Sequence, residues 1–334
     1  MDAATKDRLF GFRHAFDHPV TLWLVAGIAA ALAIAFAVIG VLRASGRVSP
    51  ELSRELELRT KSWLVLAPLL VGPVLLGAAW TILAVGALSL VCHREFARAT
   101  GFFRHRLLNG IVVLGILALT FASLDHWYAF FTALTPLVVI LIVAGAILAD
   151  EPKGYIQRVA LGIFSFLFFG TSLGHIGFMA NDADFRPIIL MLLVTVELND
   201  VFAFVTGKLF GRRKLVPHTS PNKTVGGALG AFVLTGTMAA VLGHFVFAGG
   251  PLDTPLRLAG LGAIISVGGQ LGDLMLSSIK RDLGIKDMGS AIPGHGGILD
   301  RFDSLILVAP AVFHYVGYFR GFGWHQAERI ITGG

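Results

Sequence analysis

Acidic, basic and hydroxyl side chains gather in one 27-residue stretch, Ser277 to Asp303, which lies between two apolar runs. Carboxylate oxygens bind hard cations such as Mg²⁺, and lysine and arginine bind phosphate oxygens. Asp273, Ser277 and Lys280 follow one another at spacings of four and three residues, so a helix would carry them on one face. These residue types favour metal-assisted transfer of a phosphoryl or nucleotidyl group at a membrane surface. The alternative is an Asp273–Lys280 ion pair that only balances a buried charge.

The loop within this stretch reads PGHGGILDRFD and surrounds His295 with small residues. Glycine lets the backbone approach a ligand closely, and Asp300, Arg301 and Asp303 follow at once. His295 is therefore a candidate for orienting a substrate or transferring a proton. Backbone hydrogen bonding by the glycine-flanked segment is the alternative interpretation of the same pattern.

A second polar segment precedes the first by two apolar runs. Glu197 and Asp200 are three residues apart, with Asn199 beside them, inside an otherwise apolar run. Acidic groups at membrane depth are costly and usually face a cavity, a cation or a partner. This pair is therefore a candidate for a functional role, and structural pairing with another buried group is the alternative.

The SPNKT turn that follows lies at a predicted helix start. Ser220, Lys223 and Thr224 there offer hydroxyls and an ammonium, and the helix start adds backbone amides and its positive dipole end. The turn is therefore a candidate anion site. A Walker P-loop is excluded, because the GxxxxGK[ST] spacing is absent.

The composition indicates the elements that must hold these residues. The chain has 334 residues, of which 55% are hydrophobic and only 14% charged, and its mean hydropathy is +0.76. Soluble domains carry about 25% charged residues, so we expect an all-α, polytopic integral membrane protein. The single Cys92 excludes a disulfide framework. The net charge is +6, and the basic residues lie in short blocks between apolar runs. This distribution suits contact with anionic lipid headgroups better than binding of nucleic acid.

About nine membrane-spanning helices are expected, within a range of about eight to ten. The run 63–92 is the reason for the range, since about 20 residues suffice to cross a bilayer. Pro68 and Pro73 lie inside it, so it is either one long kinked span or a helical hairpin. The expected spans are 20–42, 63–92, 107–124, 127–149, 157–179, 187–206, 225–248, 256–278 and 303–319.

We divide the chain into three regions. These are N-terminal anchor spans at 1–106 with an amphipathic, interfacial segment at 43–62, middle helices at 107–186, and a catalytic region at 187–334 with the loops 207–224 and 279–302.

The two polar loops are separated by two spans and are expected at the same membrane face. If nine spans alternate, that face also holds the N-terminus and 18 of the 27 lysines and arginines. Positive charge marks the cytoplasmic side, so the loops are predicted to be cytoplasmic. A hairpin at 63–92 would instead bring the basic segment 43–62 to this face.

The polar stretch resembles the signature of the phosphatidate cytidylyltransferase (CDP-diacylglycerol synthase) family. The SPNKT turn, and Asp200 followed by Phe204 and Gly207, are similar to the same family, so the resemblance covers roughly residues 190–320. The residues at matching spacings are Ser277, Lys280, Arg281, Lys286, Asp287, Gly289, Pro293, His295, Gly296, Gly297, Asp300, Arg301 and Asp303.

The resemblance implies a membrane enzyme of phospholipid biosynthesis that joins CTP and phosphatidic acid into CDP-diacylglycerol and pyrophosphate. It implies Mg²⁺, with a second cation and a homodimer both compatible, and a bacterial inner membrane with cytoplasmic active-site loops. By the same likeness Asp273 and Asp300 hold metal, with Asp200 and Asp303 nearby. The implied catalytic residues are Asp273, Lys280, Arg281, His295, Asp300 and Arg301, and the implied substrate-binding residues are Asn199, Ser220, Lys223, Thr224, Ser277, Lys286 and Asp287.

The sequence departs from the family pattern at two positions that bear on the identity of the lipid acceptor. Gly226 stands where family members generally carry a glutamate, and Val225 where an aromatic is usual. A paralogue acting on another phosphorylated lipid is therefore a second hypothesis. A non-enzymatic transporter or lipid-binding scaffold, with intramembrane charges along a pathway, is the third.

Overall fold

The computed structural model describes residues 3–45, 49–292, 296–322 and 329–333. Within these residues nine helices are long and apolar enough to cross a membrane, and the only named strands form one short hairpin, so the expected all-α membrane fold is confirmed. The helices are α1 (Ala3–Phe10), α2 (Pro19–Ala44), α3 (Pro50–Leu76), α4 (Ala78–Thr100), α5 (Arg106–Leu124), α6 (Tyr128–Leu148), α7 (Tyr155–Ser165), α8 (Leu173–Met179), α9 (Phe185–Phe210), α10 (Val225–Val246), α11 (Pro255–Asp282) and α12 (Leu299–Arg320). Short 3₁₀ turns cover Phe12–His14 and Phe102–Arg104, a π-helical segment (Phe166–Ser172) joins α7 to α8, and the strands are β1 (Lys214–Val216) and β2 (Ser220–Thr224).

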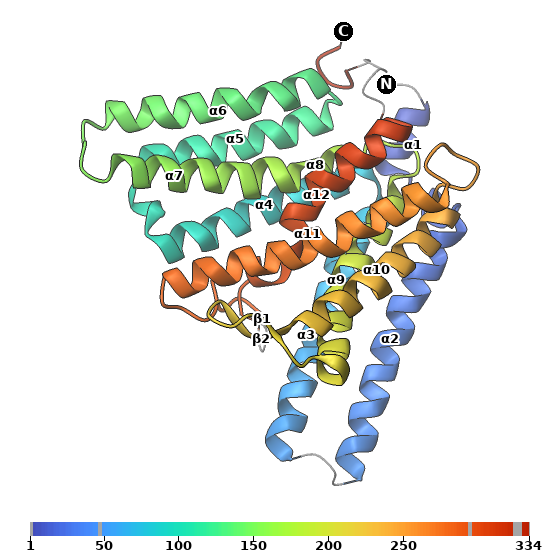
Figure 1. The fold of residues 1–334 in the computed structure, drawn as a ribbon. Coiled ribbons are helices and arrows are strands. Elements are labelled where there is room, and N and C mark those ends of the chain that lie inside the picture. Colours follow the sequence, from blue (N-terminus) through green and yellow to red (C-terminus); the bar gives the residue numbers. More distant parts are fainter. Residues whose placement is uncertain (1–2, 46–48, 293–295, 323–328, 334) are drawn as a thin grey trace.

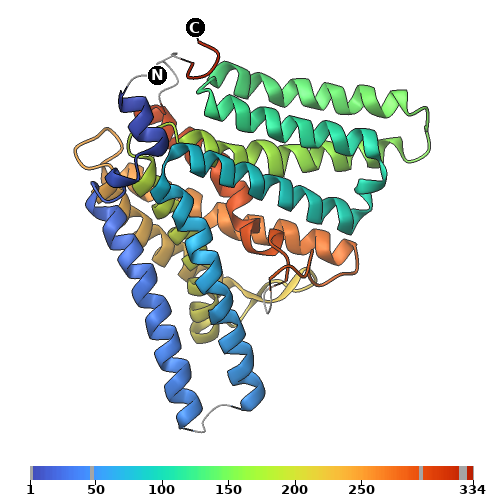
Figure 2. The ribbon, with the colours of Figure 1, turned by 180° about the vertical axis from the view of Figure 1, so that it is seen from behind.

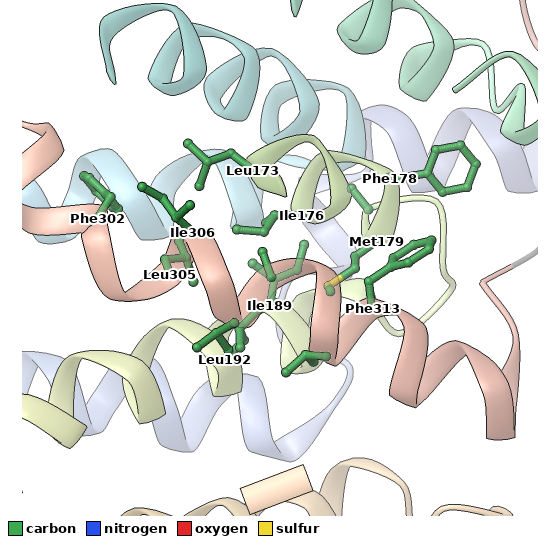
Figure 3. Packing of buried hydrophobic residues seen from close by; sticks show 14 of the residues in the cluster. Leu173, Ile176, Phe178, Met179, Ile189, Leu192, Phe302, Leu305, Ile306 and Phe313 are labelled. Atoms are coloured by element: carbon green, nitrogen blue, oxygen red, sulfur yellow. The ribbon is translucent and has the colours of Figure 1, made fainter. Parts of the chain in front are cut away.

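Two groups of helices make up the molecule. In one, α10 packs between α9 and α11, and α11 packs on α12; in the other, α4 to α8 pack side by side (Figure 1, Figure 2). Figure 3 shows where the groups meet: Leu173 and Met179 of α8 lie against Ile189 of α9 and Ile306 of α12. All four side chains are essentially inaccessible to solvent. This shared core fixes α9 and α12 relative to the middle helices.

The run 63–92 is two helices rather than one kinked span. α3 ends at Leu76 and α4 begins at Ala78, with Gly77 between them at a φ of +134°. A Cβ at Gly77 would lie 2.4 Å from the carbonyl oxygen of Leu9, so only glycine permits both this backbone conformation and this approach. The chain therefore reverses at Gly77, beside α1, which is the hairpin alternative.

The reversal places the termini at the end of the molecule opposite the β hairpin (Figure 1, Figure 2). Because α4 runs back through the bundle in addition to the nine candidate spans, a simple alternation of nine spans, which put the N-terminus on the side of the polar loops, is wrong. Of the 26 lysines and arginines that the structure describes, 19 lie in the segments at the end with the β hairpin. The other seven are Lys6, Arg8, Arg13, Arg186, Arg257, Arg320 and Arg329.

The polar segment 43–62 does not form a separate surface helix. Ser49 caps α3 by accepting a hydrogen bond from the amide of Leu52, at 3.2 Å, and the helix continues without a break to Leu76. Residues 50–62 are thus the first half of α3, so the helix that the spacing of charges predicted is present there. Figure 1 shows α2 and α3 extending together, beyond the other helices, on the side of the β hairpin.

Candidate active site

The two polar loops meet at one end of the bundle, as predicted. The β1–β2 hairpin lies beside the end of α11 and the segment that leads into α12 (Figure 1). The guanidinium Nε of Arg281 donates to the carbonyl oxygen of Thr219 at 3.3 Å, which joins the two loops directly. Segments separated by about two spans in the sequence therefore build one site.

A polar cavity of about 130 Å³ lies between α9, α11 and α12 at this end. Six acidic and two basic side chains line it, so its formal charge is strongly negative. The lining residues are Val196, Glu197, Asp200, Asp273, Lys280, Asp287, Asp300, Arg301, Asp303 and Ser304. Most of the acidic and basic residues that the sequence singled out on α9, α11 and α12 thus come together here, with Asp287 from the loop after α11, whereas Arg281 of α11 does not line the cavity.

Two ion pairs cross between elements at this cavity. Lys223 of β2 pairs with Asp273 of α11, and both side chains are about four-fifths buried. The ammonium of Lys280 lies 2.9 Å from Oδ1 of Asp300, whose side chain is only 4% exposed. The simple Asp273–Lys280 pair is therefore wrong, because each of these residues pairs with a different element.

Asp300 also organises the loop in front of α12. Its Oδ2 accepts hydrogen bonds from the amides of Met288, at 2.8 Å, and Gly297, at 2.9 Å. Gly296, at a φ of +84°, packs so tightly that an added Cβ would lie 3.1 Å from Asp300 Oδ2. Asp300 therefore binds a lysine and two amides at once, and a carboxylate with about four acceptor positions keeps one for another ligand.

Glu95 of α4 joins this site and was not predicted from the sequence. Its carboxylate accepts from the amide of Ile298 at 3.0 Å and from that of Leu299 at 2.8 Å. The only signal in the sequence is one acidic residue within the basic block that contains Arg94 and Arg98. Nothing in that block indicates a partner about 200 residues away.

The acidic residues of the cavity fit a hard cation by their chemistry. Asp200 of α9, Asp273 of α11 and Asp303 of α12 lie near enough to repel one another electrostatically. Arg301 offsets part of this charge, acting on Glu197 and Asp200. Among the described residues, no three His, Cys, Asp or Glu side chains are arranged as a ready metal site. Carboxylates of the kind that bind hard cations are thus close together, and lysines pair with two of them.

The SPNKT turn leads into a helix start, as predicted, but its residues have different contacts. Thr224 is the N-cap of α10: its hydroxyl accepts from the amide of Gly227 at 3.1 Å, and the residue is buried. Ser220 pairs with Val216 in the β hairpin. Lys223 is the residue of the turn that reaches the acidic cavity, through Asp273.

Asn199 lies in a buried polar cluster rather than in the cavity lining. Its Oδ1 accepts from the hydroxyls of Thr235 and Ser266, each at 2.9 Å, and the side chain is inaccessible to solvent. Gln270 extends the cluster by donating to Ser266 Oγ at 3.2 Å. Asn199 thus ties α9 to α10 and α11, and so holds Asp200 and Asp273 in place.

Three of the remaining predicted residues, Ser277, Arg281 and Lys286, are not among those that line the cavity. Ser277 Oγ lies 3.5 Å from Asp273 Oδ1 on the same helix face, as the spacing predicted. Arg281 and Lys286 are exposed at the end of α11 and in the following loop. His295 lies outside the residues that the structure describes, so its role stays a prediction.

Gly226, the departure from the family pattern, stands where no side chain fits. A Cβ there would lie 2.7 Å from the carbonyl oxygen of Phe210 and 3.2 Å from Cα of Gly211. The start of α10 packs directly on the end of α9. A glutamate at this position would therefore need a different backbone arrangement.

Replacing Gly226 with alanine should lower stability by about 1 to 3 kcal/mol, the usual cost of overpacking. Gly236→Ala is the matched control in the same helix, because a Cβ there meets nothing within 4 Å. That change should stabilise α10 by up to about 1 kcal/mol through helix propensity. Thermal unfolding in detergent measures both variants, and equal melting temperatures would contradict the close packing at Gly226.

Comparisons with known proteins agree on one family. The family described as "Cytidylyltransferase family" matches residues 57–319. An uncharacterized Escherichia coli protein, YnbB, is 33% identical over 276 residues, which cover 79% of this chain and 88% of that protein. A phosphatidate cytidylyltransferase of Staphylococcus haemolyticus is 41% identical over 140 residues, covering 42% of this chain and 53% of that enzyme. That of Staphylococcus saprophyticus is 44% identical over 122 residues, covering 36% and 46% respectively.

Proposed function

The chain belongs to the cytidylyltransferase family, and from that premise we propose that it transfers the cytidylyl group of CTP to the phosphate of phosphatidic acid. The products are CDP-diacylglycerol and pyrophosphate. The observation that carries the proposal is the acidic cavity between α9, α11 and α12, with Lys223, Lys280 and Arg301 around it. A triphosphate and a lipid phosphate need this combination of cation ligands and fixed positive charge.

In the proposed reaction, an oxygen of the lipid phosphate attacks the α-phosphorus of CTP. The bond from that phosphorus to the bridging oxygen breaks, and pyrophosphate leaves. No covalent protein nucleophile is needed, so the protein contributes alignment and charge. Lys223 and Lys280 would exchange their carboxylate partners for phosphate oxygens, and Arg301 would neutralise the charge that develops on the leaving group.

The residues that would hold Mg²⁺ are Asp273 and Asp300, with Asp200 and Asp303 beside them. When bound, the ion would neutralise phosphate oxygens and lower the cost of bringing two anions together. The lysines and the acidic residues then have complementary roles. The carboxylates hold the cation, and the lysines offset the repulsion among the carboxylates before the cation binds.

The location of the site supports a cytoplasmic active face. The end that carries the cavity holds 19 of the 26 lysines and arginines that the structure describes, and cytoplasmic segments carry such an excess. CTP is a cytoplasmic metabolite, and phosphatidic acid reaches the same level from the bilayer. We therefore propose that the β hairpin and the loop before α12 face the cytoplasm.

A different phosphorylated lipid as acceptor is the second candidate. Two observations favour it: the missing side chain at Gly226, and a match over most of the chain to an uncharacterized relative, YnbB, while the named phosphatidate cytidylyltransferases match over about half of their length. Both candidates use the same cation and triphosphate chemistry. They differ in the lipid alone.

The test is an assay of purified protein with CTP, Mg²⁺ and a panel of phosphorylated lipids, following release of pyrophosphate. Phosphatidic acid should give the fastest release, with CDP-diacylglycerol formed in equal amount. Faster release with another lipid phosphate would assign the paralogous activity instead. No release with any acceptor would reject a cytidylyltransferase and favour a transport or lipid-binding role.

A further inference from the structure

We propose that Glu95 is a positioning residue of this site, which sets the place of Asp300 and Arg301 from a helix outside the catalytic region. The proposal rests on the proposed function, and it adds a residue that the family resemblance over about residues 190–320 did not include. The direct observation is the pair of hydrogen bonds from the amides of Ile298 and Leu299 to the Glu95 carboxylate.

α12 needs a cap that its own sequence does not provide. The first amides of a helix have no partner within the helix, and a Ser, Thr, Asp or Asn at the N-cap usually supplies one. The N-cap of α12 is Ile298, which has no side-chain cap. Glu95 accepts the Ile298 and Leu299 amides instead, and a carboxylate there is further favoured by the positive end of the helix dipole.

The glycines of the loop leave space for this carboxylate. A Cβ at Gly297 would lie 2.5 Å from Glu95 Oε2, and a Cβ at Gly289 would lie 2.7 Å from Oε1. A side chain at either glycine would therefore displace the Glu95 carboxylate, and one at Gly297 would also lie 2.8 Å from the amide nitrogen of Gly289. Gly289 and Gly297 belong to the sequence signature, and their physical role here is to let Glu95 reach the backbone.

Two carboxylates divide the amides in front of α12 between them. Asp300 takes those of Met288 and Gly297, and Glu95 takes the next two along the chain. Because Asp300 and Arg301 follow directly, a shift of the helix start would move both away from Asp273 on α11. Displacement of reacting groups by about 1 Å can cost about 100-fold in rate. Glu95 thus controls alignment without touching a substrate.

The test compares Glu95→Gln and Glu95→Ala with wild type. Glutamine keeps one acceptor and should retain part of the activity, whereas alanine keeps none and should lower kcat about 10- to 100-fold. The Mg²⁺ concentration for half-maximal rate should rise about tenfold in Glu95→Ala, because outer partners of metal ligands affect metal affinity on that scale. A loss of folded protein alone would lower kcat and leave this concentration unchanged.

Hydrogen exchange measured by mass spectrometry gives a readout that needs no activity. In Glu95→Ala the amides of Ile298 and Leu299 should exchange about five to ten times faster than in wild type. Glu151→Gln is the matched control, since Glu151 is an exposed acid in the loop between α6 and α7 that pairs with Arg158 of α7. It should leave both exchange and rate unchanged.

The outcomes separate the two proposals. Faster exchange together with slower transfer and a higher Mg²⁺ requirement supports positioning by Glu95. Unchanged exchange, or faster exchange with wild-type kinetics, overturns it. If wild type transfers no cytidylyl group to any lipid, the proposed function fails, and the exchange result decides the cap of α12 by itself.

Discussion

Asp273→Asn should lower the rate of cytidylyl transfer about 1,000-fold, the upper range for losing one preorganised electrostatic group. Asp273 pairs with Lys223 and shares the cavity with Asp200 and Asp303. Asparagine keeps the shape but removes the charge that would bind the cation and hold the lysine. The measurement is the initial rate of pyrophosphate release at saturating CTP and Mg²⁺.

Asp282→Asn is the control for that experiment. Asp282 is exposed at the end of the same helix, α11, so its change removes one negative charge near the site without touching the cavity. Its rate should stay within about twofold of wild type, as expected for a solvated surface charge. Wild-type rates in Asp273→Asn would remove Asp273 from the cation site.

Asp300→Asn should lower both stability and activity. The change leaves the Lys280 ammonium, whose side chain is 13% exposed, without its ionic partner. Breaking a buried ion pair in this way costs about 3 to 5 kcal/mol. The melting temperature and the rate of cytidylyl transfer should both fall, the rate by about 100-fold or more.

The double variant Lys280→Met with Asp300→Asn separates the two effects. Methionine removes the unpaired ammonium, so part of the lost stability should return, while the rate stays low. If the double variant is no more stable than Asp300→Asn, the ion pair does not account for the loss. If Asp300→Asn transfers at the wild-type rate, Asp300 is not part of the catalytic machinery.

The sequence was most informative where one helix carries the pattern. Periodicity placed Asp273, Ser277 and Lys280 on one face of α11, and the structure confirms this for Asp273 and Ser277. The parity of spans likewise predicted that the two polar loops meet. Both inferences use local geometry, which the spacing of residues determines.

The sequence could not predict which charges pair. Asp273 pairs with Lys223 because the β hairpin folds back on α11, and Lys280 pairs with Asp300 because α12 returns beside α11. Spacing indicates a face of a helix but not what packs on it. Glu95 shows the same limit, since its contact with Ile298 depends on where α4 lies relative to α12. The sequence also did not determine which end of the bundle holds the N-terminus, because that depended on whether the chain reverses at Gly77.

The reversal at Gly77 makes α2 and α3 a pair of helices whose two ends lie at the same end of the molecule. α2 starts near α1 (Figure 2) and α3 ends beside Leu9 of α1, so the α2–α3 hairpin begins and ends at the same end of the molecule. A pair of helices that begins and ends on one side can be added to or removed from a membrane protein without inverting anything downstream. The family match begins within this hairpin, at residue 57, and continues through α12. The α2–α3 hairpin is in this sense topologically neutral, because its presence leaves the direction of α9, α11 and α12 unchanged.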